Sequence, residues 1–230
     1  MDFYSRLFGR QSSGGGGDGG GDELFKLAVS RDLTVLTEKM FVSNGITKIG
    51  SSAFRGCTSL TSVTIPNSVT SIGEYAFSNC SSLPSIEIPN SVTIIGGWAF
   101  RGCSSLPSIE IPNSVTSIES STFYGCSSLT SIEIPNSITK IGGNTFNRCT
   151  SLTSIEIPSS VTEIGIFSFS HCDNLASVTV LATTPPTIVP GTFADTPSSL
   201  KIYVPSGSVN AYKAASGWSN HASKIQAIPS

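Results

Sequence analysis

The sequence has few charged residues and very few histidines, methionines and tryptophans. Asp, Glu, Lys and Arg make up 12% of the 230 residues, about half the usual share, and the formal net charge is −2. Such a chain lacks the clustered positive charge with which proteins bind nucleic acid. No apolar run approaches the ~20 residues that a membrane-spanning helix needs. We therefore expect no nucleic-acid partner and no membrane span.

The N-terminus lacks the features of a secretory signal. Asp2 places an acid where a signal carries positive charge, and no apolar core of ~7 to 15 residues follows. We therefore expect a cytoplasmic protein, in a compartment that keeps thiols reduced.

The clearest positive signal is a repeat of 23 residues. The six cysteines follow one another at this spacing, at Cys57, Cys80, Cys103, Cys126, Cys149 and Cys172. A phenylalanine lies three residues before each cysteine, and a leucine lies three residues after it. A fixed period of this length is typical of solenoid proteins, in which each repeat forms one turn.

Each repeat contains a short strand. Ser85-Ile86-Glu87-Ile88 alternates polar and apolar residues, which predicts a strand with one buried face. Pro89 has no N–H to donate, so it ends the strand. Gly96 marks a second corner, and residues 99–103 are predicted to form a single helical or 3₁₀ turn. Because one repeat buries too few side chains to fold alone, neighbouring repeats are expected to stack and to pair their strands in parallel.

The pattern Cys-x-x-Leu-x-x-Ile-x-Ile-Pro-x-x-Val-x-x-Ile-Gly-x-x-x-Phe resembles the BspA-type leucine-rich repeat. The resemblance covers about residues 40 to 228. Members of that family are typically surface or adhesion proteins of bacteria and of protists such as trichomonads and amoebae. The resemblance thus implies repeats that bind proteins rather than catalyse, and it makes the cell surface the alternative location.

The predicted fold is a β-rich solenoid: a parallel β ladder of BspA-like leucine-rich repeats with short 3₁₀ or α turns and helical end caps. We divide the chain into a disordered peptide (1–13), a glycine-rich linker (14–21), an N-terminal cap (22–39), the solenoid (40–205) and a C-terminal cap (206–230). Met40 and Val42, one repeat before Val63 and Ile65, are expected in the first strand. A helix over residues 208–215, N-capped by Ser208, is expected in the C-terminal cap.

Four stacked glutamates are the first candidate binding residues. The outward position of the strand is occupied by Glu87, Glu110, Glu133 and Glu156. At ~4.8 Å in water each adjacent pair costs ~0.9 kcal/mol, so folding does not require this column, and its potential attracts cations or a basic partner. The alternative is that duplication of a whole unit copied a tolerated surface residue.

Tyr75 and Trp98 are the second candidates. They occupy the position two residues before the repeat phenylalanine, which varies while its neighbours do not, and variation inside a copied unit indicates solvent exposure. We expect the two rings to be adjacent and partly exposed. Large aromatic side chains are common binding anchors, although a local packing role is the alternative.

Nothing in the sequence indicates catalysis, a cofactor or a metal site. The cysteines lack the paired ligands two to four residues apart that zinc requires, and are expected to be buried, inert thiols. The Gly-x-Gly-x-x-Gly at Gly14, Gly16 and Gly19 arises because that tract is nearly all glycine. His171 and His221 are the only histidines, and no nucleophile elbow is present.

We therefore predict a non-enzymatic scaffold that serves in protein–protein interaction or adhesion through the strand face. The partner is a protein, with a basic surface if the glutamate column takes part. The alternative is a structural protein that packs into a larger particle or shell.

Overall fold

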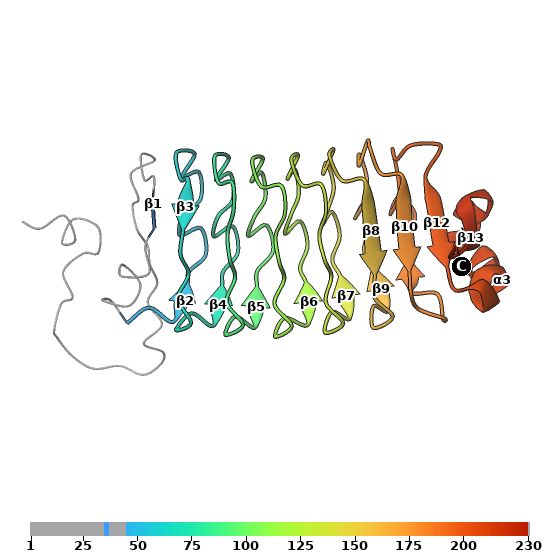
Figure 1. Ribbon diagram of the computed structural model, residues 1–230, viewed down its shortest axis with the longest axis horizontal. Coiled ribbons are helices and arrows are strands. Elements are labelled where there is room, and N and C mark those ends of the chain that lie inside the picture. The colour runs from blue at the N-terminus through green and yellow to red at the C-terminus, as the bar shows by residue number, and fades with distance from the viewer. Residues whose placement is uncertain (1–34, 37–44, 230) are drawn as a thin grey trace, which may run out of the picture.

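The computed structural model describes residues 35–36 and 45–229 (Figure 1). Successive turns of the chain stack side by side along one axis, and the C-terminal helix lies at one end of the stack. Paired strands are parallel, and in most turns their Cα partners are one repeat apart, as in Lys48 with Ser71 and Ser154 with Ser177. The predicted parallel solenoid is confirmed, and one turn corresponds to one repeat.

The first ladder contains the strands predicted from the alternating pattern. It comprises β1 (Val35–Leu36) paired with β3 (Ser62–Val63), and β8 (Ser154–Ile157), β10 (Ser177–Val180), β12 (Lys201–Val204) and β13 (Ile225–Ala227). Between these two groups, single bridges join Thr64 to Glu87 and Glu110 to Glu133.

Two prolines explain why this ladder is irregular in the middle turns. The Thr130 N–H donates to the Pro107 carbonyl over 3.0 Å, and the Ala176 N–H donates to the Thr153 carbonyl over 2.8 Å. Pro84 and Pro107 stand in the same column and have no N–H to donate. Strands of four residues on this face therefore begin at β8.

A second ladder runs along the stack and was not predicted from the sequence. It comprises β2 (Lys48–Ile49), β4 (Ser71–Ile72) and β5 (Ile94–Ile95), and then β6 (Ser117–Ile118), β7 (Lys140–Ile141), β9 (Glu163–Ile164) and β11 (Thr187–Ile188). No pairing joins β5 to β6 in the described sheets, so this ladder is divided into two. The sequence predicts only a corner at the corresponding Ile-Gly pairs, because two residues are too few to display an alternation.

The segment that follows the second ladder forms the predicted single turns, as where the Cys103 N–H donates to the Phe100 carbonyl over 3.2 Å, but these turns do not join into a continuous helix. Its N–H groups do bond three residues back, as in Cys57 to Phe54 over 3.1 Å. Left-handed residues interrupt it, at φ 55° for Tyr75 and 57° for Trp98, and a right-handed helix cannot continue through them. Instead, the Phe54 N–H donates to the carbonyl of Ala76 in the next turn over 2.7 Å, which makes this third side another row of inter-turn bonds.

Stacked phenylalanines fill the interior. The rings of the repeat column lie nearly parallel, with neighbouring centroids 5.3 to 5.8 Å apart, at Phe54, Phe77, Phe100, Phe123, Phe146, Phe169 and Phe193. The column is fully buried except at Phe193, which is 3% exposed. Such aromatic pairs contribute about 0.5–1.5 kcal/mol each beyond the area they bury.

The C-terminal cap closes this aromatic column. It consists of η1 (Ser206–Ser208), α3 (Val209–Ala214) and η2 (Trp218–Lys224), followed by β13, which pairs with β12. Trp218 contacts Phe193 with centroids 5.9 Å apart and donates from Nε1 to the Pro186 carbonyl over 2.7 Å. The predicted helix is present, but Ser208 caps it with no side-chain hydrogen bond, because η1 leads into α3 with Ser208 already in the right-handed helical region.

The ladder reaches further toward the N-terminus than the predicted boundary at residue 40. Leu36 pairs with Val63, so β1 lies within the range assigned to the N-terminal cap. Met40 and Val42, the peptide 1–13 and the linker 14–21 lie outside the described residues.

One glycine column lets the turns approach each other closely. A Cβ added to Gly73 would lie 2.6 Å from the Ser51 nitrogen, and one added to Gly96 would lie 2.6 Å from the Glu74 nitrogen. Neither glycine has a positive φ, so the requirement is for space between backbones. The same column contains Gly142 and Gly165, and in it Glu119 takes the place of a glycine.

We predict that Gly73→Ala destabilises the solenoid by about 1–3 kcal/mol, because the added methyl group forces two turns apart. Urea unfolding followed by circular dichroism measures the change. Gly207→Ala is the control, since nothing lies within 4 Å of a Cβ at that position, and it should change stability by less than about 1 kcal/mol. Equal losses in the two variants would contradict the close approach.

Candidate binding face

The four column glutamates lie on the outer side of the first ladder. The backbones of Glu110 and Glu133 form a parallel β-bridge, and Glu156 of β8 pairs in register with Thr179 of β10. All four side chains are exposed, while the isoleucines on either side of them point into the core. The structure therefore places the predicted column on one surface, which we call the glutamate face.

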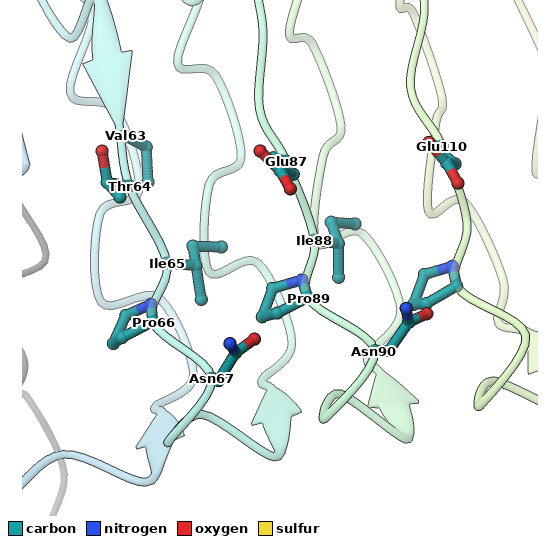
Figure 2. Close-up of a pocket in the computed structure, with 11 residues that line it drawn as sticks. Val63, Thr64, Ile65, Pro66, Asn67, Glu87, Ile88, Pro89, Asn90 and Glu110 are labelled. Carbon is teal, nitrogen blue, oxygen red and sulfur yellow. The ribbon is translucent and has the colours of Figure 1, made fainter.

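A groove runs beside the N-terminal half of the glutamate face. It has a volume of ≈ 580 Å³, and Figure 2 shows how its lining repeats from turn to turn. Carboxylates stand along one side, and the prolines that end the strands stand along the other with an asparagine next to each. The polar lining residues are Thr64, Asn67, Glu87, Asn90 and Glu110.

The carboxylates of the glutamate face have no cationic partner in the part of the chain that the structure describes. The ion pairs there are Lys140 with Glu163, 3.0 Å apart, and His171 with Asp195, 3.5 Å apart. Adjacent glutamates therefore repel each other by ~0.9 kcal/mol per pair before salt screens them. A ligand with positive charge would relieve this repulsion.

The second predicted pair, Tyr75 and Trp98, is brought together as expected. The two rings are stacked, with centroids 5.0 Å apart and planes at 10°, and both residues are half-buried. Arg55 lies over the Tyr75 ring, its Cζ 5.1 Å from the centroid, and Arg101 lies over Tyr124 in the same way. The backbones of Tyr75 and Trp98 are left-handed, and both residues are partly exposed, unlike the buried phenylalanines of the core.

The six cysteines are buried and unbridged, which confirms that they are free thiols. From Cys80 onward each Sγ donates to the carbonyl of the repeat phenylalanine in the preceding turn, over 3.1 to 3.2 Å. Burial raises the pKa of every one of these thiols from the ordinary value of 9.0, and that of Cys172 to about 12. A thiol that stays protonated is a poor nucleophile and a poor metal ligand.

These pKa shifts predict that the protein loses stability above pH 9. The thiols ionise near pH 9 in the unfolded chain but remain neutral in the fold, so their contribution is complete below pH 9 and falls as the pH rises. Each contributes a slope of up to about 1.4 kcal/mol per pH unit. We expect Cys126→Ala to make the fall of the unfolding free energy with pH, measured between pH 9 and 11, less steep by about 1.4 kcal/mol per pH unit. Val115 is buried but not ionisable, so the control variant Val115→Ala should lower stability without changing this pH dependence. An unchanged pH dependence in Cys126→Ala would contradict the raised pKa of the buried thiol.

Neither histidine is part of a catalytic arrangement within the described residues. His171 contacts the exposed carboxylate of Asp195, and His221 packs edge-on against Phe193. Burial and the nearby Lys224 lower the pKa of His221. In the same residues no group of three or more His, Cys, Asp and Glu side chains could hold a metal ion.

In the described part of the chain, no helix is both long and apolar enough to cross a bilayer.

The outer column of the second ladder was not predicted from the sequence. Its members are Lys48, Ser71, Ile94, Ser117, Lys140, Glu163 and Thr187. Among them Ile94 is 60% exposed, the highest value for a large apolar side chain in the described residues. The sequence does contain one signal of an irregular turn in this ladder: Ile118 is followed by Glu119, whereas the other isoleucines of the column are followed by glycine, at Ile72, Ile95, Ile141 and Ile164.

A parallel ladder over a core of repeated leucines and phenylalanines defines the chain as a leucine-rich repeat solenoid. The model of the BspA type leucine rich repeat region matches residues 33–149 and 99–216. The chain therefore belongs to the BspA-type leucine-rich repeat family, as the residue pattern predicted.

Solved structures of bacterial leucine-rich repeat proteins share this fold. A T. pallidum protein is 33% identical over 59% of this chain and 67% of its own, with a TM-score of 0.56. A Bacteroides ovatus protein is 31% identical over 71% of this chain and 48% of its own, also with a TM-score of 0.56. A Eubacterium ventriosum protein is 25% identical over 66% and 41%, with a TM-score of 0.58. This chain thus spans less than half the length of two of these proteins. No match to a curated protein was found.

Proposed function

We propose that this protein is a non-enzymatic scaffold that binds a protein partner, in protein–protein interaction or adhesion, through the glutamate face. The observation that carries the proposal is a row of exposed, unpaired carboxylates beside a groove of ≈ 580 Å³. A rigid row of like charges costs folding free energy, and a ligand with basic side chains would recover that cost on binding. The stacked Tyr75 and Trp98 serve as anchors on a second surface, beside the second ladder.

Support for a binding role also comes from the rest of the surface. The thiols are buried, His171 contacts Asp195 and His221 packs against Phe193, and the described residues contain no group that could hold a metal ion. The fold instead supplies an extended surface whose backbone is fixed by inter-turn hydrogen bonds. A pre-ordered surface loses little conformational entropy when it binds, which favours recognition of a partner.

The proposal is tested with a peptide of ten lysines as a probe of the glutamate face. We expect the unmodified chain to bind it with an affinity that falls as salt rises, and replacement of all four column glutamates by glutamine to reduce the affinity at least tenfold. The control removes negative charges outside both the groove beside the glutamate face and the groove that Trp98 lines, through Glu163→Gln, Asp173→Asn and Asp195→Asn. Calorimetry at several salt concentrations gives both quantities.

Equal loss of affinity in the two variants would show that net charge alone attracts the probe. No loss in either would also overturn the glutamate face. The column variant should in addition be as stable as the original or more so at low salt, because it removes repulsion between neighbouring turns.

A second candidate is self-assembly into a larger particle. It is favoured by a cluster of exposed apolar side chains, in which Ile166 is 45%, Phe167 40% and Val189 37% exposed. Light scattering over a range of concentrations, with and without residues 1–21, separates the two functions. Particles that grow with concentration would favour assembly, and a constant monomer would favour the scaffold.

A further inference from the structure

The second ladder is interrupted where Glu119 replaces the column glycine. In the neighbouring turns, Gly96 donates its N–H to the Ile72 carbonyl over 2.8 Å and Gly142 donates to Ile118 over 2.7 Å. Within the residues that the structure describes, the Glu119 N–H makes no such bond to Ile95. A Cβ at this position would meet the preceding backbone at about the distances found for Gly73 and Gly96, so the glutamate holds its turn away from β5.

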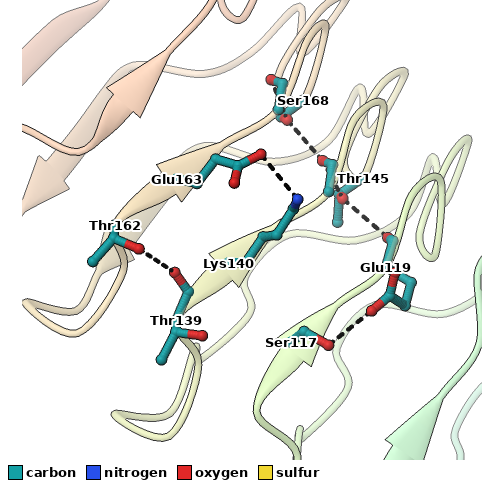
Figure 3. A network of polar contacts seen from close by, with 10 residues as sticks. Ser117, Glu119, Thr139, Lys140, Thr145, Thr162, Glu163 and Ser168 are labelled. Carbon is teal, nitrogen blue, oxygen red and sulfur yellow. Dashed lines mark hydrogen bonds and ion pairs between the residues drawn. The ribbon is translucent and has the colours of Figure 1, made fainter.

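The interruption is local. The third side of the solenoid remains joined across the same two turns, because the Trp98 N–H donates to the Ser120 carbonyl over 3.0 Å. The Glu119 backbone is also held in place, since its carbonyl accepts from the hydroxyls of Thr122, over 2.8 Å, and Thr145, over 3.3 Å. Figure 3 shows Glu119 beside Ser117, whose hydroxyl donates to the Glu119 carboxylate over 2.8 Å. The gap is therefore fixed in shape.

A groove of ≈ 570 Å³ occupies this region of the second ladder. Its lining includes the half-buried Trp98 and the exposed residues Ile94, Glu74 and Glu119. The lining contains no basic side chain, and Gly73, Gly96 and Gly97 contribute no side chain to it. An aliphatic side chain, an indole ring and two acidic residues thus line one groove.

We propose that this groove receives an arginine side chain of a partner protein. A guanidinium is flat, stacks on an indole and forms paired hydrogen bonds with a carboxylate, while its methylene groups pack on an aliphatic side chain such as Ile94. The chain already uses this packing nearby, where Arg55 and Arg101 lie over tyrosine rings. The proposal rests on the protein-binding role of the solenoid but not on the glutamate face.

The test uses the variant in which all four column glutamates are glutamine, so that the glutamate face cannot contribute. The probe is an eight-residue peptide of alternating arginine and glycine, compared with the same peptide in which citrulline replaces arginine. Citrulline keeps the shape but removes the charge. Trp98 fluorescence reports occupancy, because the other tryptophan, Trp218, is fully buried.

We expect the arginine peptide to change the fluorescence and the citrulline peptide to have little effect. Glu119→Gln should reduce the affinity for the arginine peptide about tenfold, which corresponds to the loss of one charge-assisted hydrogen bond. Glu163→Gln, on the same ladder but outside the groove, should leave the affinity unchanged. Glu119→Gly should abolish binding, because the ladder can then close, and the amide at position 119 should become protected from hydrogen exchange.

The proposal is overturned if both peptides bind equally or if Glu119→Gln and Glu163→Gln weaken binding to the same extent. It is also overturned if Glu119→Gly leaves binding intact. A negative result with the arginine peptide would not change the decalysine result on the original chain, so the arginine groove and the glutamate face are tested independently.

Discussion

Hydrogen bonds between the backbones of successive turns determine the rest of this structure. They run along three sides of the solenoid, through two β ladders and through the row that joins each repeat phenylalanine to the next turn. These bonds require turns of nearly constant length and backbones that approach closely. Serine, threonine and glycine suit such corners, because their side chains either bond a neighbouring carbonyl or are absent. The hydroxyls of Thr70 and Thr93, for example, each donate to the turn before.

Register between the turns converts sequence columns into physical surfaces. Phenylalanines one repeat apart become one continuous ring stack, and glutamates one repeat apart become neighbouring charges. A turn that is longer by a single residue is tolerated where Ser177 pairs with Lys201, because the extra residue lies in the corner near Pro185 and Pro186. Each outward residue of the repeat therefore recurs as a row along the solenoid surface, and a residue that departs from the repeat forms a single site in that row.

The period made much of the structure predictable. The spacing of the cysteines and phenylalanines is enough to predict the stacking, the inward residues and the adjacency of Tyr75 with Trp98. The second ladder could not be predicted in this way, because its strands of two residues are too short to show an alternation. The left-handed backbone at Tyr75 and Trp98 also contradicts local propensity, since inter-turn bonds impose it on residues that rarely adopt it. The groove at Glu119 depends on a single departure from the glycine column, and its effect appears only once the two backbones are placed beside each other.

The most direct test of this account measures scalar couplings across the inter-turn hydrogen bonds by NMR. We expect a coupling between the Phe100 nitrogen and the Thr122 carbonyl carbon, with equivalent couplings from Phe54 to Ala76 and from Phe123 to Thr145. Gly142 should couple to Ile118, and the nitrogen of residue 119 should show no coupling to Ile95. Couplings at another spacing would contradict the register, and a coupling at residue 119 would contradict the interruption.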